Sequence, residues 1–158
     1  MCKSKILLKN IFSEESEVKD LTEEKYNQDY EALTFSFKEE TYQSRLAKKT
    51  PTKSGYFVTC WTKDEDNYNR PYKIEEFADY LIVAVIDDEL NGYFLFPREL
   101  LVEKGILASS KYQGKMAFRV YPKWCNQLNK TAGQTQKWQC KYFLSFNDER
   151  FLVLLYSK

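Results

Sequence analysis

The side chains in this sequence best suited to chemistry are cations interleaved with hydroxyls and aromatic rings. The first group is Arg45, Lys48, Lys49 and Lys53, around the turn at Thr50–Thr52 with its central proline. Cations and hydroxyls at a proline-constrained turn can bind a phosphate group. The alternative interpretation is an ordinary solvated turn, because charged side chains mostly face water.

A second group lies between Gly114 and Trp124. If residues 115–121 form a strand, Lys115, Arg119 and Tyr121 share one face, because side chains alternate along a strand. Most of the intervening side chains are apolar and would face the core. The strand therefore has a basic side, which Lys123 extends, although an arginine on such a strand is often an ordinary surface residue.

The third group lies in residues 134–141, where helical spacing aligns Gln134, Lys137 and Lys141. Trp138 lies on the neighbouring line. Amides and cations can contact phosphates, and an indole can stack on an exposed base. In the alternative, Trp138 is a core residue, as aromatic residues at helical spacing usually are.

The net charge of +1 hides a strong asymmetry along the chain. Residues 104–141 carry eight basic and no acidic side chains, whereas residues 74–103 carry one basic and eight acidic ones. Basic residues mixed with aromatic ones suit a nucleic-acid groove, because counterion release provides affinity and ring faces accept bases. In the alternative, the acidic segment neutralises the basic one within the fold.

We therefore predict a basic face that binds nucleic acid, with DNA favoured over RNA. The residues expected on this face are Arg45, Lys48, Lys53, Lys115, Arg119, Tyr121, Lys123, Lys137, Trp138 and Lys141.

Several enzyme classes are excluded by residues and motifs that the sequence lacks. It contains no His, which removes Ser-His-Asp and Cys-His catalysis as well as histidine metal sites. Its four cysteines form no CxxC pair, so a zinc site is not expected. The glycine-rich phosphate motifs GxGxxG and GxxxxGK are also missing. We expect no metal and no cofactor.

The main enzymatic alternative is a metal-dependent nuclease of the PD-(D/E)XK type. Its chemistry needs carboxylates that hold a divalent ion and a lysine that polarises the attacking water. The acid-x-Lys patterns at 17–19 and 23–25 precede the first predicted strand. Glu31, Asp79 and Lys48 could still converge into a degenerate site. Catalysis is the less favoured interpretation.

A small-ligand or protein-interaction module is the third alternative. In such a module, Arg45 and Arg119 would pair internally with Asp79 or Glu31, and the basic face would not be displayed. Burial of these arginines in ion pairs would favour this alternative. The sequence leaves the oligomeric state open.

The periodicity of apolar residues predicts the elements that position these side chains. The predicted helices are 5–12, 22–30, 97–105 and 131–146, and the predicted strands are 33–37, 42–48, 56–62, 79–86, 93–96 and 115–121, with a last strand or helical turn at 151–156. This order predicts an α+β fold with a mixed, mainly antiparallel sheet and flanking helices. We expect one domain over residues 1–158, with a helical N-terminal part at 1–30 and a sheet core at 31–158.

Length and composition set the remaining limits. A chain of 158 residues fits one domain, and 43% hydrophobic residues exclude a largely disordered chain. The longest apolar run, 81–86, is too short to span a bilayer. Scattered cysteines without a signal peptide predict reduced thiols in a cytoplasmic protein that has no membrane partner.

An ordered set of motifs resembles the MepB-like family of bacterial proteins. The matching segments are Arg45–Trp61, Phe77–Asp79, Gly92–Pro97, Lys104–Ile106, Gly114–Pro122 and Thr135–Gln139. The founding member is encoded beside a multidrug efflux pump and its regulator. The resemblance implies a small cytoplasmic α/β protein with suspected nucleic-acid binding and a distant likeness to the nuclease fold.

The chain departs from the pattern of this family at several positions. Tyr56 and Tyr93 stand where Gln is expected after Gly, and Met116-Ala117 replaces a more basic or Gly-containing pair. Cys125 replaces an acidic residue after Trp124. The last change matters most, because it removes a potential metal ligand or polar contact.

Overall fold

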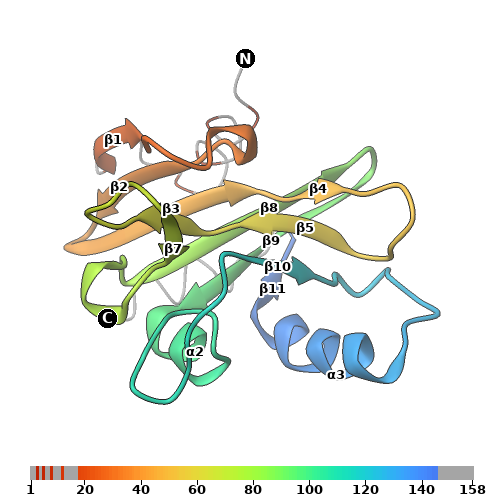
Figure 1. Cartoon of the computed structure of the whole chain (residues 1–158). Coiled ribbons are helices and arrows are strands. Elements are labelled where there is room, and N and C mark those ends of the chain that lie inside the picture. Colours follow the sequence, from red (N-terminus) through yellow and green to blue (C-terminus); the bar gives the residue numbers. More distant parts are fainter. Residues whose placement is uncertain (1–2, 4, 6–7, 9–11, 13–17, 146–158) are drawn as a thin grey trace.

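A computed structural model describes residues 3, 5, 8, 12 and 18–145 of the chain (Figure 1). The element predicted at 151–156 lies outside the described residues, as does most of the helix predicted at 5–12. Lys5 and Leu8 of that segment are helical, as is Lys3 just before it.

The largest layer is a six-stranded sheet in the order β1-β2-β3-β8-β9-β11. Its strands are β1 (Val18–Glu23), β2 (Leu33–Phe37), β3 (Glu40–Leu46), β8 (Tyr80–Asp87), β9 (Leu90–Pro97) and β11 (Phe143–Leu144). Only β3 and β8 run parallel among these neighbours, so the sheet is mixed and mainly antiparallel, as predicted.

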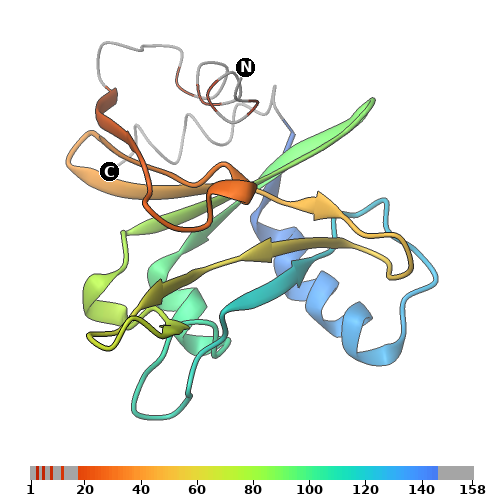
Figure 2. The same ribbon diagram turned by 45° about the horizontal axis from the view of Figure 1, so that its top comes forward.

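Two smaller sheets cross in front of this layer (Figures 1 and 2). One has the order β10-β5-β4, and the other pairs β6 with β7. Their strands are β4 (Lys48–Lys49), β5 (Tyr56–Thr59), β6 (Trp61–Lys63), β7 (Asn69–Pro71) and β10 (Ala117–Val120). The helical elements are η2 (Gln28–Tyr30), η3 (Ile74–Glu76), α2 (Arg98–Glu103), α3 (Lys130–Gln139) and η4 (Cys140–Tyr142). The predicted α+β class is confirmed.

Strand β8 lies at the centre of the core. Residues 81–85 are all buried, because both faces of the strand are covered. Leu81, Val83 and Val85 pack toward the β10-β5-β4 sheet and helices α2 and α3, whereas Ile82 and Ala84 pack toward a second cluster with Phe12. A continuous apolar run is the expected pattern for such a strand.

The N-terminal part differs from its prediction. The helix predicted from Thr22 is wrong, because Val18–Glu23 forms an edge strand antiparallel to β2 and only the short helix η2 follows. The side chains of β1 are mostly exposed. The strand is therefore held by backbone pairing with β2. Its sequence has no alternation of apolar residues from which a strand could be predicted.

The C-terminal helix is shorter than predicted. Helix α3 ends at Gln139, and the chain continues through η4 into β11 rather than staying helical to residue 146. Phe143 and Leu144 pair with Phe94 and Tyr93, so β11 covers the outer edge of β9. In the described part of the chain, no helix has the length and apolar character needed to cross a membrane.

Candidate nucleic-acid interface

Lys48, Phe57 and Arg119 form a row across the β10-β5-β4 sheet. Phe57 is the register partner of Lys48 on one side and of Arg119 on the other, so the three side chains share a face. The adjacent residues Tyr56 and Val58 are buried, so this shared face points outward. The guanidinium carbon of Arg119 lies 5.8 Å from the Phe57 ring centroid. Two cations thus flank one aromatic ring on the surface.

Arg119 is held in place by the turn at residues 50–55. Its Nη1 donates to the carbonyl oxygen of Ser54 at 3.0 Å, and its Nη2 donates to Oγ1 of Thr50 at 2.7 Å. Both acceptors are neutral, so the charge of Arg119 is not compensated by these contacts. The predicted phosphate site at this turn is altered accordingly, because the Thr50 hydroxyl already binds Arg119.

Tyr121 also serves this turn. A Cβ placed on Gly55, whose φ is +80°, would lie 2.6 Å from the Tyr121 ring. Only glycine therefore fits there, both for its left-handed backbone and for the close approach of the ring. Tyr121 was predicted on the basic face, and its ring packs against Gly55 of the turn. Lys53, in the same turn, is exposed.

Tyr30 of η2 completes the row and was missed by the sequence reasoning. The Nζ of Lys48 lies 5.1 Å from its ring centroid, and the Tyr30 and Phe57 centroids are 6.1 Å apart. Burial, and then the negative charge of Asp29, raise the pKa of the Tyr30 hydroxyl. Phe57 could have been found from its outward position in the predicted strand at 56–62. Tyr30 carries no such signal, because its place depends on a distant loop.

That loop, residues 24–31, is fastened at several points. The backbone N–H of Glu24 donates to the carbonyl oxygen of Ala32 at 2.9 Å and closes the loop. The side chain of Asn27 pairs with the backbone of Trp61, donating from Nδ2 at 2.8 Å and accepting at Oδ1 at 3.4 Å. Asn27 has φ 64° and Glu31 has φ 49°. Such left-handed non-glycine residues cost energy and persist only where the surroundings fix them.

Arg45 does not belong to the outward face, and its predicted placement there is corrected. Its side chain is fully buried and forms a bidentate ion pair with Glu24. Its Nε donates to the carbonyl oxygen of Thr59 at 3.0 Å, so β5 lies directly over it. Burial lowers the pKa of the guanidinium, but the Glu24 carboxylate, together with smaller contributions from Cys60 and Tyr72, raises it above its usual value.

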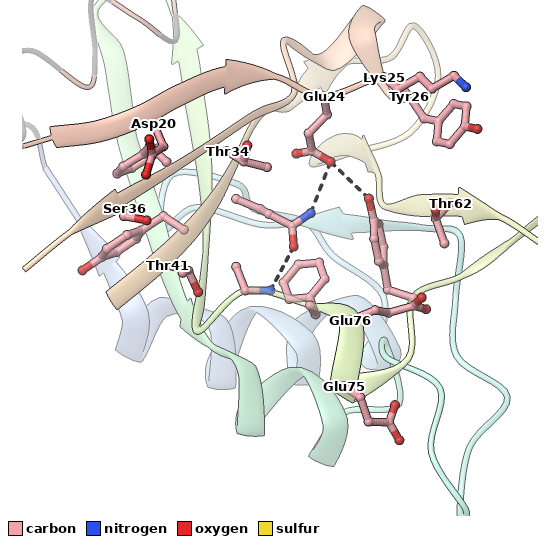
Figure 3. Close-up of a pocket in the computed structure, with 16 residues that line it drawn as sticks. Asp20, Glu24, Lys25, Tyr26, Thr34, Ser36, Thr41, Thr62, Glu75 and Glu76 are labelled. Atoms are coloured by element: carbon pink, nitrogen blue, oxygen red, sulfur yellow. Dashed lines mark hydrogen bonds between the residues drawn. The ribbon is translucent and has the colours of Figure 1, made fainter. Parts of the chain in front are cut away.

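Glu24 is the hub of a buried polar cluster (Figure 3). Besides Arg45, it accepts hydrogen bonds from Nε2 of Gln43 at 3.2 Å and from the Tyr72 hydroxyl at 3.1 Å. Burial raises the pKa of the nearby Cys60 thiol to about 11, against the lowering effect of Arg45. Because every charged atom in the cluster has a partner, the cluster anchors loop 24–31 to the sheet.

A cavity of about 640 Å³ adjoins Glu24. Figure 3 shows carboxylates from separate elements around it, with Asp20 on β1 and Glu75 and Glu76 on η3. Glu76 is already paired with Arg70, which lowers the pKa of its carboxyl group. The acidic character of this cavity makes it unsuited to a polyanion.

The three candidate nuclease residues do not share one site. The carboxylate of Asp79 accepts from the backbone N–H of Thr41 at 2.9 Å, at the start of β3. Lys48 lies seven residues further along the chain from Thr41, about 23 Å away at the rise of a strand. Antiparallel pairing of β2 with β3 carries Glu31 toward the Lys48 end. Among the described residues, no three His, Cys, Asp or Glu side chains are grouped to hold a metal ion.

Trp138, Lys137 and Lys141 lie elsewhere, on the side of α2 and α3. Together with Lys104 they line a cavity of about 430 Å³, and the Nζ of Lys104 lies 5.2 Å from the Trp138 ring centroid. Trp138 is half-buried, and its ring packs 5.7 Å from that of Phe96. Figures 1 and 2 place helices α2 and α3 and loop 24–31 on opposite sides of β5.

The two remaining predicted cations are also dispersed. Lys123 lines a cavity of about 370 Å³ with Glu89 and Trp124, beside the β8–β9 hairpin. Lys115 is exposed and precedes β10. The predicted basic residues therefore divide into separate groups, of which Lys48 and Arg119 form the row described above.

Two glutamines of the 135–139 motif have structural roles that the sequence reasoning missed. Gln136 donates from Nε2 to the carbonyl oxygens of Pro122 and Cys125, at 3.0 and 2.8 Å. Gln139 is fully buried, donates to the carbonyl oxygen of Arg119 at 2.9 Å and accepts from the backbone N–H of Tyr121 at 2.8 Å. Helix α3 is thereby joined to β10.

The fold and this face define a single α+β domain with an aromatic and cationic surface on its smaller sheet. The sequence model of the family described as MepB-like matches residues 24–145, so the chain belongs to the MepB-like family. This chain is similar to a crystal structure of MepB, with 85% sequence identity and a TM-score of 0.84. The match covers 93% of this chain and 99% of the MepB chain. No curated protein matches the sequence significantly.

Proposed function

We propose that this protein binds nucleic acid, with DNA as the first target, through the outward face of the β10-β5-β4 sheet. The observation that carries the proposal is the row of Lys48, Phe57 and Arg119 in register, with Tyr30 beside it. Cations attract phosphates and release counterions, and the ring faces can stack on bases.

The arrangement is prepared for an anionic partner. Arg119 is fixed by two hydrogen bonds to neutral oxygens, so its orientation is set before a ligand arrives. Lys48 extends from the sheet over Tyr30 and is exposed. A guanidinium and an ammonium on either side of one ring can contact the backbone while the ring contacts a base.

Arg45 meets the expectation of the interaction-module alternative in part, because it is buried in an ion pair, but with Glu24 rather than with Asp79 or Glu31. Arg119 does not meet it, since its hydrogen bonds go to Thr50 and Ser54 rather than to a carboxylate. The surroundings of Arg119 therefore favour the binding of a polyanion over the alternative of an internal ion-pair network.

The test is a salt titration of DNA and RNA binding with two matched lysine variants. Lys48 and Lys49 are adjacent, but Lys48 shares the outward face whereas Lys49 pairs with Asp87 at 3.5 Å. We expect Lys48→Ala to weaken binding and reduce the salt slope by about one, as for one lost phosphate contact. Lys49→Ala removes the same charge and should change both quantities less.

Arg119→Ala should act in the same direction as Lys48→Ala. Undetectable binding of both nucleic acids by the unmodified chain, or binding that is independent of salt, would refute the proposal. Equal effects of Lys48→Ala and Lys49→Ala would mean that the nucleic acid does not specifically contact the row of Lys48, Phe57 and Arg119.

A further inference from the structure

The outward face does not end at the row, because the same strand direction continues from β5 into β6. Residues 57 and 59 are half-buried between the buried residues 56, 58 and 60, and residues 61–63 of β6 are all half-buried. The alternation places Phe57, Trp61 and Lys63 along one side of the chain. A second aromatic residue thus follows the first at a distance of four residues, about 13 Å at the rise of a strand.

Trp61 forms an aromatic pair of its own with Tyr26. The two ring centroids lie 5.3 Å apart with an interplanar angle of 24°, which is a stacked arrangement. The Nζ of Lys63 lies 5.6 Å from the Trp61 ring and 5.7 Å from the Tyr26 ring. Lys25 contributes another ammonium at 5.6 Å from Tyr26. The pair therefore repeats the composition of the row, with rings beside cations.

One loop supplies a tyrosine to each pair. Tyr30 lies against Phe57 and Tyr26 lies on Trp61, and both tyrosines belong to loop 24–31. Asn27, between them, is fixed to the backbone of Trp61 by both ends of its amide. The two ring pairs are therefore held in a fixed relation before any ligand binds.

We propose that this protein selects single-stranded nucleic acid, whose bases stack on the Tyr30–Phe57 and Tyr26–Trp61 pairs along β5 and β6. The proposal rests on the proposed function and adds the strand state of the ligand. Sheet-borne aromatic residues accept unpaired bases by stacking. A duplex keeps its ring faces inside its own stack, so it would gain from the cations alone.

The charge along this track is uneven. Asp29 is exposed on the same loop, and Asp64 follows Lys63 directly. The Asp64 carboxylate is engaged by the backbone N–H groups of Asp66 and Tyr68, both at 2.9 Å. Cations flank the two ring pairs while acidic residues lie beside them, so stacking must contribute more to affinity here than on a uniformly basic surface.

The experiment compares a single-stranded oligonucleotide of 15 thymidines with a duplex of mixed sequence and equal length, using the full chain. Trp61→Leu and Tyr26→Leu keep an apolar side chain and remove a ring. We expect each to weaken single-strand binding about tenfold, as for the loss of one stacked base, and to leave duplex binding within about twofold. Tyr68→Ala is the matched control, because Tyr68 is 72% exposed at the neighbouring turn.

A second readout is intrinsic fluorescence. Stacking of a base on the Tyr26–Trp61 pair should quench Trp61, so Trp61→Phe should lose the quenching that the oligonucleotide causes in the unmodified chain. This variant keeps a ring and the fold, and circular dichroism checks the leucine variants.

The outcomes separate this inference from the proposed function. If duplex and single strand bind equally and the ring variants have no effect while Lys48→Ala weakens both, the inference fails and nucleic-acid binding stands. If neither nucleic acid binds, the proposed function fails as well. Preference for the single strand that is lost in the ring variants and kept in Tyr68→Ala supports the inference.

Discussion

Arg45 and Arg119 lie in two regions that the sequence presents as similar, and their surroundings differ completely. Arg45 is on β3, inside the six-stranded sheet, where β5 covers it and Glu24 neutralises it. Arg119 is on β10, an edge strand of the smaller sheet, where its hydrogen bonds go to neutral oxygens of a turn.

The comparison shows that the sheet order, rather than the local sequence, decides whether a cation is structural or displayed. A charge beneath a second layer needs a buried partner, because an unpaired buried charge is very costly. A charge on an edge strand remains in water and is available to a ligand. Removing each arginine should therefore affect a different property of the protein.

The largest expected effect is on stability, for Arg45→Ala. The substitution leaves the Glu24 carboxylate buried without its cation, and breaking such a pair costs about 3–5 kcal/mol of the free energy of unfolding. Urea denaturation followed by circular dichroism measures this change.

The double variant Glu24→Gln with Arg45→Met serves as the control, because it removes both charges and should recover much of the loss. A loss below about 1 kcal/mol for Arg45→Ala would mean that the ion pair does not anchor loop 24–31.

The next effect is on binding, for Arg119→Ala. We expect an affinity for DNA about tenfold lower, because one charge-assisted contact is lost. The free energy of unfolding should change by about 1 kcal/mol or less, since only two hydrogen bonds at the surface are removed. Fluorescence anisotropy and urea denaturation of one preparation give both values, and a stability loss as large as that of Arg45→Ala would contradict the comparison.

A smaller effect is expected on the stability of the protein at acid pH, and it concerns Tyr56, the buried neighbour of Phe57, and its partner Asp87. The Tyr56 hydroxyl donates to Asp87 at 2.6 Å and, with Lys49 and against burial, lowers the pKa of that carboxyl group. A carboxyl group with a lowered folded pKa stabilises the protein above its unfolded pKa, about 3.9, and this contribution is lost as the pH falls through the folded value.

Thermal unfolding measured from about pH 2.5 to about pH 6, a range that spans the unfolded pKa, checks this prediction. Asp87→Asn should lower Tm at pH 6 and flatten the acid branch below about pH 4. Asp88→Asn alters the exposed neighbour and should leave the profile as it is. Parallel profiles for both variants would argue against a role for the Tyr56–Asp87 bond.

The smallest effect is expected on the side of α2 and α3. Lys137→Ala combined with Lys141→Ala should reduce DNA affinity by less than about threefold, because helix α3 and the η4 turn that carry them lie on the other side of β5 from loop 24–31, so they contribute only a screened, distant charge. The same anisotropy titration decides the point. A loss that matches that of Arg119→Ala would show that the cavity at Trp138 is also part of the binding surface.

Some of this arrangement could be predicted from the sequence. The buried central strand at 81–85 and the outward position of Arg119 follow from apolar runs and from strand alternation. Burial of Arg45 in an ion pair was one of the alternatives, but its partner could not be foreseen, because Glu24 lies in the loop that follows an edge strand whose exposed side chains carry no pattern. Tyr30 was missed for the same reason, since a distant loop places it.

The amide of Gln139 has a consequence for association between chains. Strand β10 lies at the edge of its sheet, and the backbone groups on such an edge can pair with a strand from another molecule. Gln139 occupies the carbonyl of Arg119 and the N–H of Tyr121, and the Cys140 thiol lies 3.4 Å from the carbonyl of Tyr121. A side chain from a helix thus takes the place of a neighbouring strand, and it guards the edge that carries Arg119 against aggregation.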